Sequence, residues 1–170
     1  MSRYGFEILS NPDSLQGLSA DVREACIEAH LTPTPRLHES RFISASGAAT
    51  AMIDISDGFA SDLRHLCRAS GVGAHIELMP LLTPTLIGVI GDTAGSHEPE
   101  WVLEGGEDYE LLFTIKPEAE AEFCDEMERI TGCPVTEIGT IREASYGIRA
   151  VDSAGHKFGL NPRGWDHFRG

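Results

Sequence analysis

A short apolar run, residues 48–55, ends in an acidic turn and is followed directly by residues with helical spacing. Asp54 and Asp57 flank Ser56 in this turn, and Gly58 comes next. A strand that ends here would project Asp54 and Ser56 to one side and place Asp57 at the start of a helix. The chain therefore has to build its fold around a strand, an acidic turn and a helix in immediate succession.

The turn at residues 54–58 contains the residue types of a site for a metal-bound nucleotide. Backbone N–H groups at a helix start favour phosphate, and paired carboxylates such as Asp54 and Asp57 favour hard cations, above all Mg²⁺. The alternative is structural, because Ser56 or Asp57 could simply cap the helix by accepting its free N–H groups. This turn alone leaves both interpretations open.

A second acidic segment covers residues 103–113 and contains a Gly-Gly step at Gly105 and Gly106. Such a step allows a ligand to approach the backbone closely. Four acidic residues surround it, and an apolar run at residues 111–115 follows. Because buried strands rarely contain so much acid, we expect these carboxylates to lie at a strand entrance and to face a cleft. The alternative is an acidic hairpin turn on the surface.

Composition excludes several classes of function. The 170 residues carry a formal net charge of -14, which argues against nucleic-acid binding and against anionic membrane surfaces. No apolar run is long enough to span a bilayer, and no signal peptide is recognisable. The cysteines at positions 26, 67, 124 and 133 form no C-x-x-C pair, which indicates reduced thiols in a cytoplasmic protein.

Hydrophobic spacing predicts helices that alternate with strands. Helices should begin after Ser19, which is a plausible N-cap, after Gly58 and at Pro117. Strands are expected at residues 48–55, 74–78, 111–115, 135–141, 148–151 and 157–160. This pattern predicts an α+β fold in which a mixed β-sheet is layered with helices.

Three further expectations concern order and packing. Residues 1–18 lack periodicity and should form a poorly defined segment before a single domain at residues 19–170, and residues 37–47 read as an exposed connection. In the helix after Pro117, the apolar stripe that should face the core is Ala121, Phe123, Cys124, Met127 and Ile130.

Several motifs together resemble the thiamine-monophosphate kinase family. The turn at residues 54–58 followed by Ser61 and Asp62 resembles that family, as does the segment at residues 105–111. The residues Pro33 to Arg36 and the aromatic tail at residues 164–168 are similar to it as well. The resemblance implies the fold of the C-terminal domain of the aminoimidazole-ribotide synthase superfamily. Phe59 departs mildly from the leucine that is typical of the family.

The resemblance also implies an activity, which is transfer of the γ-phosphoryl group of ATP to thiamine phosphate with Mg²⁺ as cofactor. By analogy Asp54 and Asp57 would be catalytic and would hold Mg²⁺, and Ser56 would contact ATP. Glu107 would bind the thiamine moiety, and Trp165 would pack against it. A cationic thiazolium ring suits both a carboxylate and an aromatic face.

Family members carry an N-terminal domain that supplies most of the nucleotide site and forms a homodimer, and the sequence contains nothing that resembles it. We therefore expect a C-terminal half that is inactive without its N-terminal partner. Two alternatives stay open, namely a non-catalytic ligand-binding or assembly domain and half of a related ATP-dependent synthase.

Overall fold

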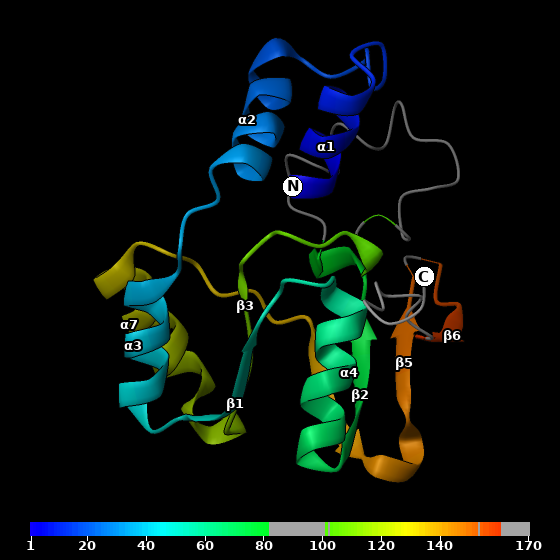
Figure 1. Ribbon diagram of the computed structural model, residues 1–170. Coiled ribbons are helices and arrows are strands. Elements are labelled where there is room, and N and C mark those ends of the chain that lie inside the picture. Colours follow the sequence, from blue (N-terminus) through cyan, green and yellow to red (C-terminus); the bar gives the residue numbers. More distant parts are fainter. Residues whose placement is uncertain (82–100, 102, 153, 161–170) are drawn as a thin grey trace.

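The computed structural model describes residues 1–81, 101, 103–152 and 154–160, and it combines helices with two β-sheets (Figure 1). The α-helices are α1 (Ser2–Ser10), α2 (Ala20–Leu31), α3 (Leu37–Ser46), α4 (Phe59–Ser70) and α7 (Glu120–Thr131). Short 3-10 helices are η1 (Met79–Leu81), η2 (Pro117–Ala119) and η3 (Ala144–Tyr146). The strands are β1 (Ala49–Asp54), β2 (Val72–Glu77), β3 (Leu111–Ile115), β4 (Gly139–Glu143), β5 (Ile148–Val151) and β6 (Lys157–Gly159).

The strands form a two-stranded and a four-stranded sheet within the described residues. In the first, β1 and β3 run antiparallel, and Asp54 at the end of β1 lies opposite Leu111 at the start of β3. In the second, the order is β4-β2-β5-β6, with β2 parallel to β5 and the other neighbours antiparallel. Helices combined with a mixed sheet agree with the predicted α+β class.

The largest apolar cluster packs α4 against the four-stranded sheet. Leu63 and Leu66 of α4 are buried with Ala74 and Ile76 of β2, and Figure 1 shows α4 lying alongside β2. Leu112 of β3 joins the same cluster and connects it to the smaller sheet. The residues before and after α4 are therefore anchored on both sheets.

A second cluster packs α3 and α7 together beside the β1–β3 sheet (Figure 1). Ile43 of α3 is fully buried, and Phe123 and Met127 of α7 lie against it. The prediction for α7 is right for Phe123 and Met127 but wrong for Ala121 and Ile130, whose side chains are exposed. The cluster needs only one narrow face of α7.

The N-terminal segment forms a helical hairpin, so the expectation of poor order for residues 1–18 is wrong. Helix α1 packs on α2 at one end of the molecule (Figure 1) and buries Tyr4 and Ile8 beside Cys26 of α2. Tyr4 and Ile8 are one helical turn apart, and this short stripe becomes effective only against the partner helix. Ser19 caps α2 as predicted, because its Oγ accepts the N–H of Val22 at 3.4 Å.

Two other expectations also require correction. Residues 37–47 are not an exposed connection, because residues 37–46 form α3 and bury Ile43. The strand expected at residues 135–141 begins later, as β4 at Gly139, because the pairing of Ile76 with Gly139 is the first in its register with β2. In the described parts of the chain, no helix combines the length and the apolar character needed to cross a bilayer.

Candidate functional site

The acidic turn connects the end of β1 to the start of α4. Strand β1 ends at Asp54, and α4 begins at Phe59 with Gly58 as its N-cap in a conformation of φ 110°. Gly58 makes no side-chain cap, and neither Ser56 nor Asp57 caps the helix, so the capping alternative is wrong. Asp54 is exposed, whereas Ser56 and Asp57 are half-buried.

The second acidic segment runs directly along this turn. The N–H of Glu107 donates to the carbonyl oxygen of Ser56 at 2.9 Å, and the N–H of Tyr109 donates to that of Ile55 at 2.9 Å. The N–H of Ile55 in turn donates to the carbonyl oxygen of Glu110 at 2.8 Å. The segment is not a hairpin turn, because the strand that follows it, β3, pairs with β1. Two acidic segments about fifty residues apart in the sequence are thus brought together.

Gly106 makes this close approach possible. A Cβ atom at this position would lie 2.5 Å from the carbonyl oxygen of Ser56, which is closer than real Cβ contacts come. The Gly-Gly step recognised in the sequence is therefore required for the two backbones to meet.

The backbone of the second segment is strained. Glu107 has φ 64° and Tyr109 has φ 50°, both in the left-handed region that residues other than glycine rarely adopt. Each such residue costs about 1–2 kcal/mol relative to the right-handed region. Since the bonds to Ser56 and Ile55 hold these conformations in place, the strain is part of how the site is built.

A buried carboxylate holds the turn from the other side. Asp62 lies in the first turns of α4, and its Oδ2 accepts the N–H of Ser56 at 2.9 Å and the N–H of Asp57 at 3.1 Å. Burial raises the pKa of Asp62, the two backbone hydrogen bonds oppose that rise, and the neighbouring Asp57 and Asp54 carboxylates add to it. Asp62 was noted in the sequence only as part of the resemblance, and its role is visible only in three dimensions.

The helical hairpin contributes two residues that sequence reasoning missed. The N–H of Ser2 donates to Oδ1 of Asp108 at 2.9 Å, and the Ser2 hydroxyl lies 2.9 Å from Nδ1 of His30. The same ring nitrogen of His30 lies 3.6 Å from Oε2 of Glu107. The sequence offers no signal for His30, because its proximity to Glu107 depends on how α1 and α2 pack.

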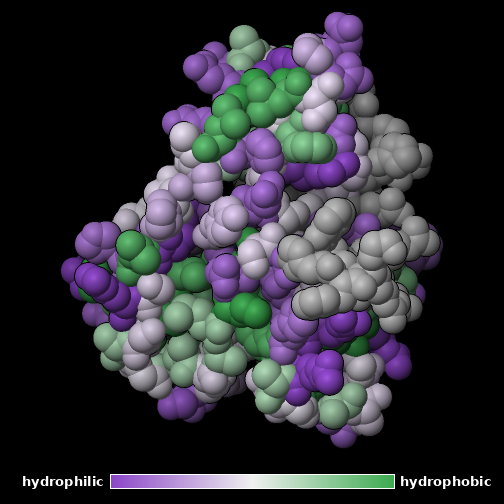
Figure 2. All heavy atoms as spheres, viewed as in Figure 1, coloured by the Kyte–Doolittle hydropathy of each residue, from purple (hydrophilic) through white to green (hydrophobic). Residues whose placement is uncertain are grey.

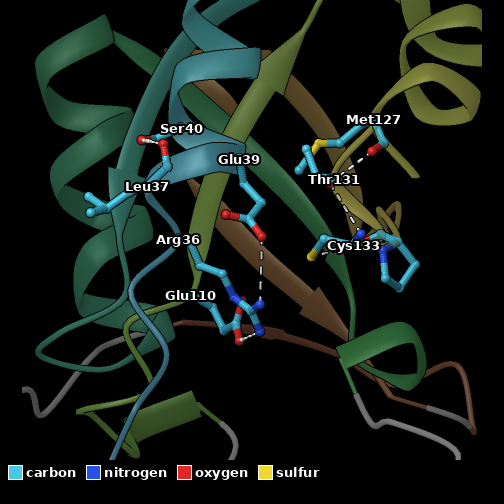
Figure 3. Close-up of polar contacts among 9 residues, drawn as sticks. Arg36, Leu37, Glu39, Ser40, Glu110, Met127, Thr131 and Cys133 are labelled. Atoms are coloured by element: carbon cyan, nitrogen blue, oxygen red, sulfur yellow. Dashed lines mark hydrogen bonds and ion pairs between the residues drawn. The ribbon is translucent and has the colours of Figure 1, made fainter. Parts of the chain in front are cut away.

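Arg36 fixes the end of the acidic segment next to β3. Its Nε and one terminal nitrogen donate to the two carboxylate oxygens of Glu110 at 2.9 and 2.6 Å, and Glu39 lies 3.8 Å away (Figure 3). The hydrogen bond to Glu110 raises the pKa of Arg36, which stays charged at every accessible pH. In the sequence Arg36 is noted as part of the resemblance, and in this structure its guanidinium is occupied by Glu110.

A groove of about 1310 Å³ begins beside this ion pair and runs between the two sheets. Figure 2 shows apolar surface in the middle of the molecule, between the α3 side and the α4 side. Among the described residues, the lining includes Arg36, Asp108 and Glu110, together with Leu63, Ile76, Leu112 and other apolar side chains. Ile55 of the acidic turn also lines the groove, whereas Asp54, Asp57 and Glu107 are outside the described lining, so these three carboxylates border the groove.

The structure therefore brings together four of the five candidate residues. Asp54, Ser56 and Asp57 share the turn after β1, and the backbone of Glu107 is bonded to that turn. Trp165, the fifth candidate, lies outside the described residues. The roles assigned to these residues stay predictions.

Asp54 and Asp57 fit a Mg²⁺ ion by chemistry but do not surround one. Their carboxylate oxygens are the donors that Mg²⁺ prefers, and both charges are close enough to act on Asp62. Within the part of the chain that the structure describes, no group of three or more His, Cys, Asp or Glu side chains could hold a metal ion. Mg²⁺ is commonly held by one or two carboxylates with water and substrate phosphates, so two carboxylates suffice when a nucleotide is bound.

The fold is an α+β domain in which two acidic segments are paired, and comparison with known families agrees with this fold. The family described as AIR synthase related protein, C-terminal domain, matches residues 9–152. The chain belongs to this family.

Several of the similar proteins are kinases. The chain is 37% identical to the thiamine-monophosphate kinase of Escherichia coli (strain K12), over 98% of its own length and 49% of that protein. It is 35% identical to the thiamine-monophosphate kinase of Aquifex aeolicus (strain VF5), over 85% of its own length and 42% of that protein. The solved structure of AaThiL complexed with AMPPCP and TMP superposes with a TM-score of 0.73 at 33% identity, over 98% of this chain and 48% of that one. The chain thus spans about half the length of the curated relatives that it matches.

Proposed function

We propose that this chain is the C-terminal half of a kinase that transfers the γ-phosphoryl group of ATP to thiamine phosphate and forms thiamine diphosphate. The observation that carries the proposal is the hydrogen bond from the N–H of Glu107 to the carbonyl of Ser56 at 2.9 Å. This bond joins the turn at residues 54–58, which is expected to bind the metal and the nucleotide, to the second acidic segment, which is expected to bind thiamine phosphate. The similarity to thiamine-monophosphate kinases over 98% of the chain supports the same function.

In the proposed reaction, a terminal oxygen of thiamine phosphate forms a bond to the γ-phosphorus of ATP while the bond to the bridging oxygen breaks and ADP leaves. Such a transfer depends mainly on positioning and on charge neutralisation. Asp54 and Asp57 would hold Mg²⁺, which supplies that neutralisation when bound. Ser56 would contact ATP, and the N–H groups at the start of α4 would attract its phosphates.

Glu107 would recognise the acceptor. Its side chain is 60% exposed, while its backbone is bonded to the turn. The carboxylate would attract the cationic thiazolium ring, and Trp165 would cover the face of that ring. Reduced cysteines are consistent with a cytoplasmic kinase, since all four thiols are free.

We propose further that the chain turns over only with its N-terminal half, and that the complete protein is a homodimer. The two described carboxylates leave the rest of the nucleotide site to other groups. The test measures ATP-dependent formation of thiamine diphosphate by the chain alone and by the chain mixed with the N-terminal half of the E. coli relative. We expect product only from the mixture, and turnover by the chain alone would contradict this proposal.

Binding to the chain itself separates this proposal from a non-catalytic assembly domain. A ligand that binds only the folded state at about 100 times its Kd adds about 2.7 kcal/mol of stability. We expect thiamine diphosphate with Mg²⁺ to raise the Tm, and we expect Asp57→Asn, Glu107→Gln and Trp165→Ala to weaken the response. Glu118→Gln, an exposed site on η2, is the matched control. An unchanged Tm in the unsubstituted chain would favour the assembly domain.

A further inference from the structure

Asp62 lies in an environment that disfavours the ionised form of its carboxyl group. Its side chain is 3% exposed, and removing an ionised carboxylate from water is costly unless it is paired or hydrogen-bonded. Two further carboxylates, Asp54 and Asp57, belong to the turn that Asp62 bonds, and like charges oppose its ionisation. An apolar residue would avoid these costs but would leave the N–H groups of Ser56 and Asp57 without this acceptor, so the reason for an aspartate here lies in the turn that it bonds.

The hydrogen bonds of Asp62 are concentrated on the functional turn. One oxygen, Oδ2, accepts the backbone N–H groups of both Ser56 and Asp57. Because a charged acceptor makes stronger hydrogen bonds than a neutral one, two successive peptide groups are held with their N–H bonds directed at α4.

The opposite side of the same turn is also fixed. The carbonyl oxygen of Ser56 accepts the N–H of Glu107 at 2.9 Å. Residue 56 is therefore bonded through its N–H to Asp62 and through its carbonyl to Glu107. With both peptide groups fixed, the side chains of Ser56 and Asp57 have few directions left to them.

We propose that Asp62 is a positioning residue that holds Ser56 and Asp57 in the conformation that binds Mg²⁺ and the nucleotide phosphates. This inference rests on the proposed function. Asp62 is not itself a ligand, because its side chain is buried and the oxygen that faces the turn already accepts two hydrogen bonds. It acts through the backbone, because its bonds to the N–H groups of Ser56 and Asp57 orient residues that would bind the metal and the nucleotide.

Three substitutions at residue 62 distinguish the contribution of its hydrogen-bond acceptor from those of its negative charge and its volume. Asp62→Asn keeps an oxygen that can accept both N–H groups and removes the charge. Asp62→Leu keeps a similar volume and removes the acceptor, and Asp62→Glu keeps the charge but moves the acceptor by one methylene. Ser61→Ala is the matched control, because Ser61 is buried in the same turn of α4 at 7% exposure.

The first measurement needs no enzyme activity. Amide hydrogen exchange followed by NMR on the chain should show protected N–H groups at Ser56 and Asp57. We expect exchange at both to become about tenfold faster or more in Asp62→Leu and Asp62→Glu, to increase less in Asp62→Asn, whose neutral oxygen is a weaker acceptor, and to stay nearly unchanged in Ser61→Ala. Equal protection in a folded Asp62→Leu or Asp62→Glu variant would overturn the proposal.

The second measurement tests the metal directly. MnCl₂ should broaden the amide signals around Asp54 and Asp57, and about 10–100 times more Mn²⁺ should be needed in Asp62→Glu and Asp62→Leu than in Asp62→Asn. A purely structural role for Asp62 would lower the Tm of these variants without changing the Mn²⁺ concentration required. If MnCl₂ leaves these signals unchanged in the unsubstituted chain, the proposal is wrong.

When the N-terminal half is supplied, Asp62→Leu and Asp62→Glu should raise the Mg²⁺ concentration needed for half-maximal rate by about tenfold or more. The KM for thiamine phosphate should change far less. If the unsubstituted mixture makes no thiamine diphosphate but Mn²⁺ binding still depends on residue 62, the proposed kinase function fails while the positioning role stands.

Discussion

Gly106 shows how much of this site depends on the absence of one methyl group. Its Cα faces the carbonyl of Ser56, at a place where a Cβ would stand 2.5 Å from the oxygen atom. The backbone of residues 106–110 can lie against the turn at residues 55–58 only while that space is empty. The Gly-Gly step is thus a steric requirement of the fold as well as a sequence motif.

We expect Gly106→Ala to lower the free energy of unfolding by about 1–3 kcal/mol, the usual cost of overpacking. The variant should also weaken the Tm response to thiamine diphosphate, because the Glu107 bond to Ser56 would be displaced. Gly159→Ala in β6 adds the same methyl group where no atom lies within 4 Å and is the control. Urea unfolding of both variants measures the difference, and equal stability would refute the steric argument.

The Arg36–Glu110 ion pair should contribute modestly. Its side chains are 27% and 49% exposed, so solvent screens the interaction. We expect a double-mutant cycle with Arg36→Gln and Glu110→Gln to give a coupling free energy of about 0.5–1 kcal/mol, at the upper end for exposed pairs because the contact is bidentate. The Arg129–Glu126 pair on α7, at 3.5 Å and 68% and 51% exposure, is the comparison. A larger coupling for that pair would contradict this ranking.

At the scale of elements, the helical hairpin of α1 and α2 depends on a second close approach. A Cβ on Gly5 of α1 would lie 2.1 Å from the carbonyl oxygen of Cys26 in α2. Cys26 is fully buried against Tyr4 and Ile8, so the two helices are in close contact at this point. The hairpin carries Ser2 and His30 to the acidic segment, and its packing therefore sets their positions.

Gly5→Ala should destabilise the protein even though alanine favours helix by about 1 kcal/mol over glycine. We expect a net loss of about 1–2 kcal/mol, because overpacking at a backbone oxygen exceeds the gain in propensity. Ser10→Ala at the exposed end of α1 tests propensity without the clash. Thermal unfolding compares the two, and a higher Tm for Gly5→Ala would show that the helices can move apart.

The sequence predicts the elements that carry local signals and misses those that depend on tertiary packing. Ser19 at the start of α2, and Gly71 and Gly132 in left-handed conformations after α4 and α7, all mark helix ends by local chemistry. Helix α3, by contrast, buries only Ile43 and gains its stability from α7. Such a helix has too narrow an apolar face to be recognised from spacing.

The candidate site divides in the same way. The turn at residues 54–58 and the segment at residues 105–110 can be found because several unusual residues are adjacent in the sequence. Asp62 and His30 cannot be assigned a role in this way, since each acts on residues that only the fold brings near. Sequence reasoning thus identified the groups expected to bind ligand but not those that hold them.

At the scale of the whole molecule, the four free thiols differ in how deeply they are buried. Burial raises the pKa of Cys26, Cys67, Cys124 and Cys133 above the ordinary value of 9.0. The folded state therefore holds these protons more tightly than the unfolded chain does. The free energy of unfolding should fall as the pH rises through about 9, because ionisation then favours the unfolded state.

Alkylation by iodoacetamide measures the same property by residue, since the thiolate is the reactive form. In the folded protein at pH 8 we expect Cys124 and Cys133, which are half-buried, to be labelled first. Cys26 and Cys67, at 0% and 2% exposure, should resist until urea unfolds the chain. Mass spectrometry of the peptides reads out each site, and early labelling of Cys26 would mean that the hairpin of α1 and α2 opens readily.

At Glu107, which like Tyr109 has a left-handed backbone, selection for stability and selection for function would favour different residues. Glycine at either position would adopt the φ values of 64° and 50° without penalty and would make the protein harder to unfold. Under the proposed function, glycine at 107 would also abolish the carboxylate that recognises the vitamin. A laboratory lineage selected for heat resistance alone should thus drift toward glycine there, whereas one selected for growth without added vitamin should keep the glutamate and tolerate its awkward conformation.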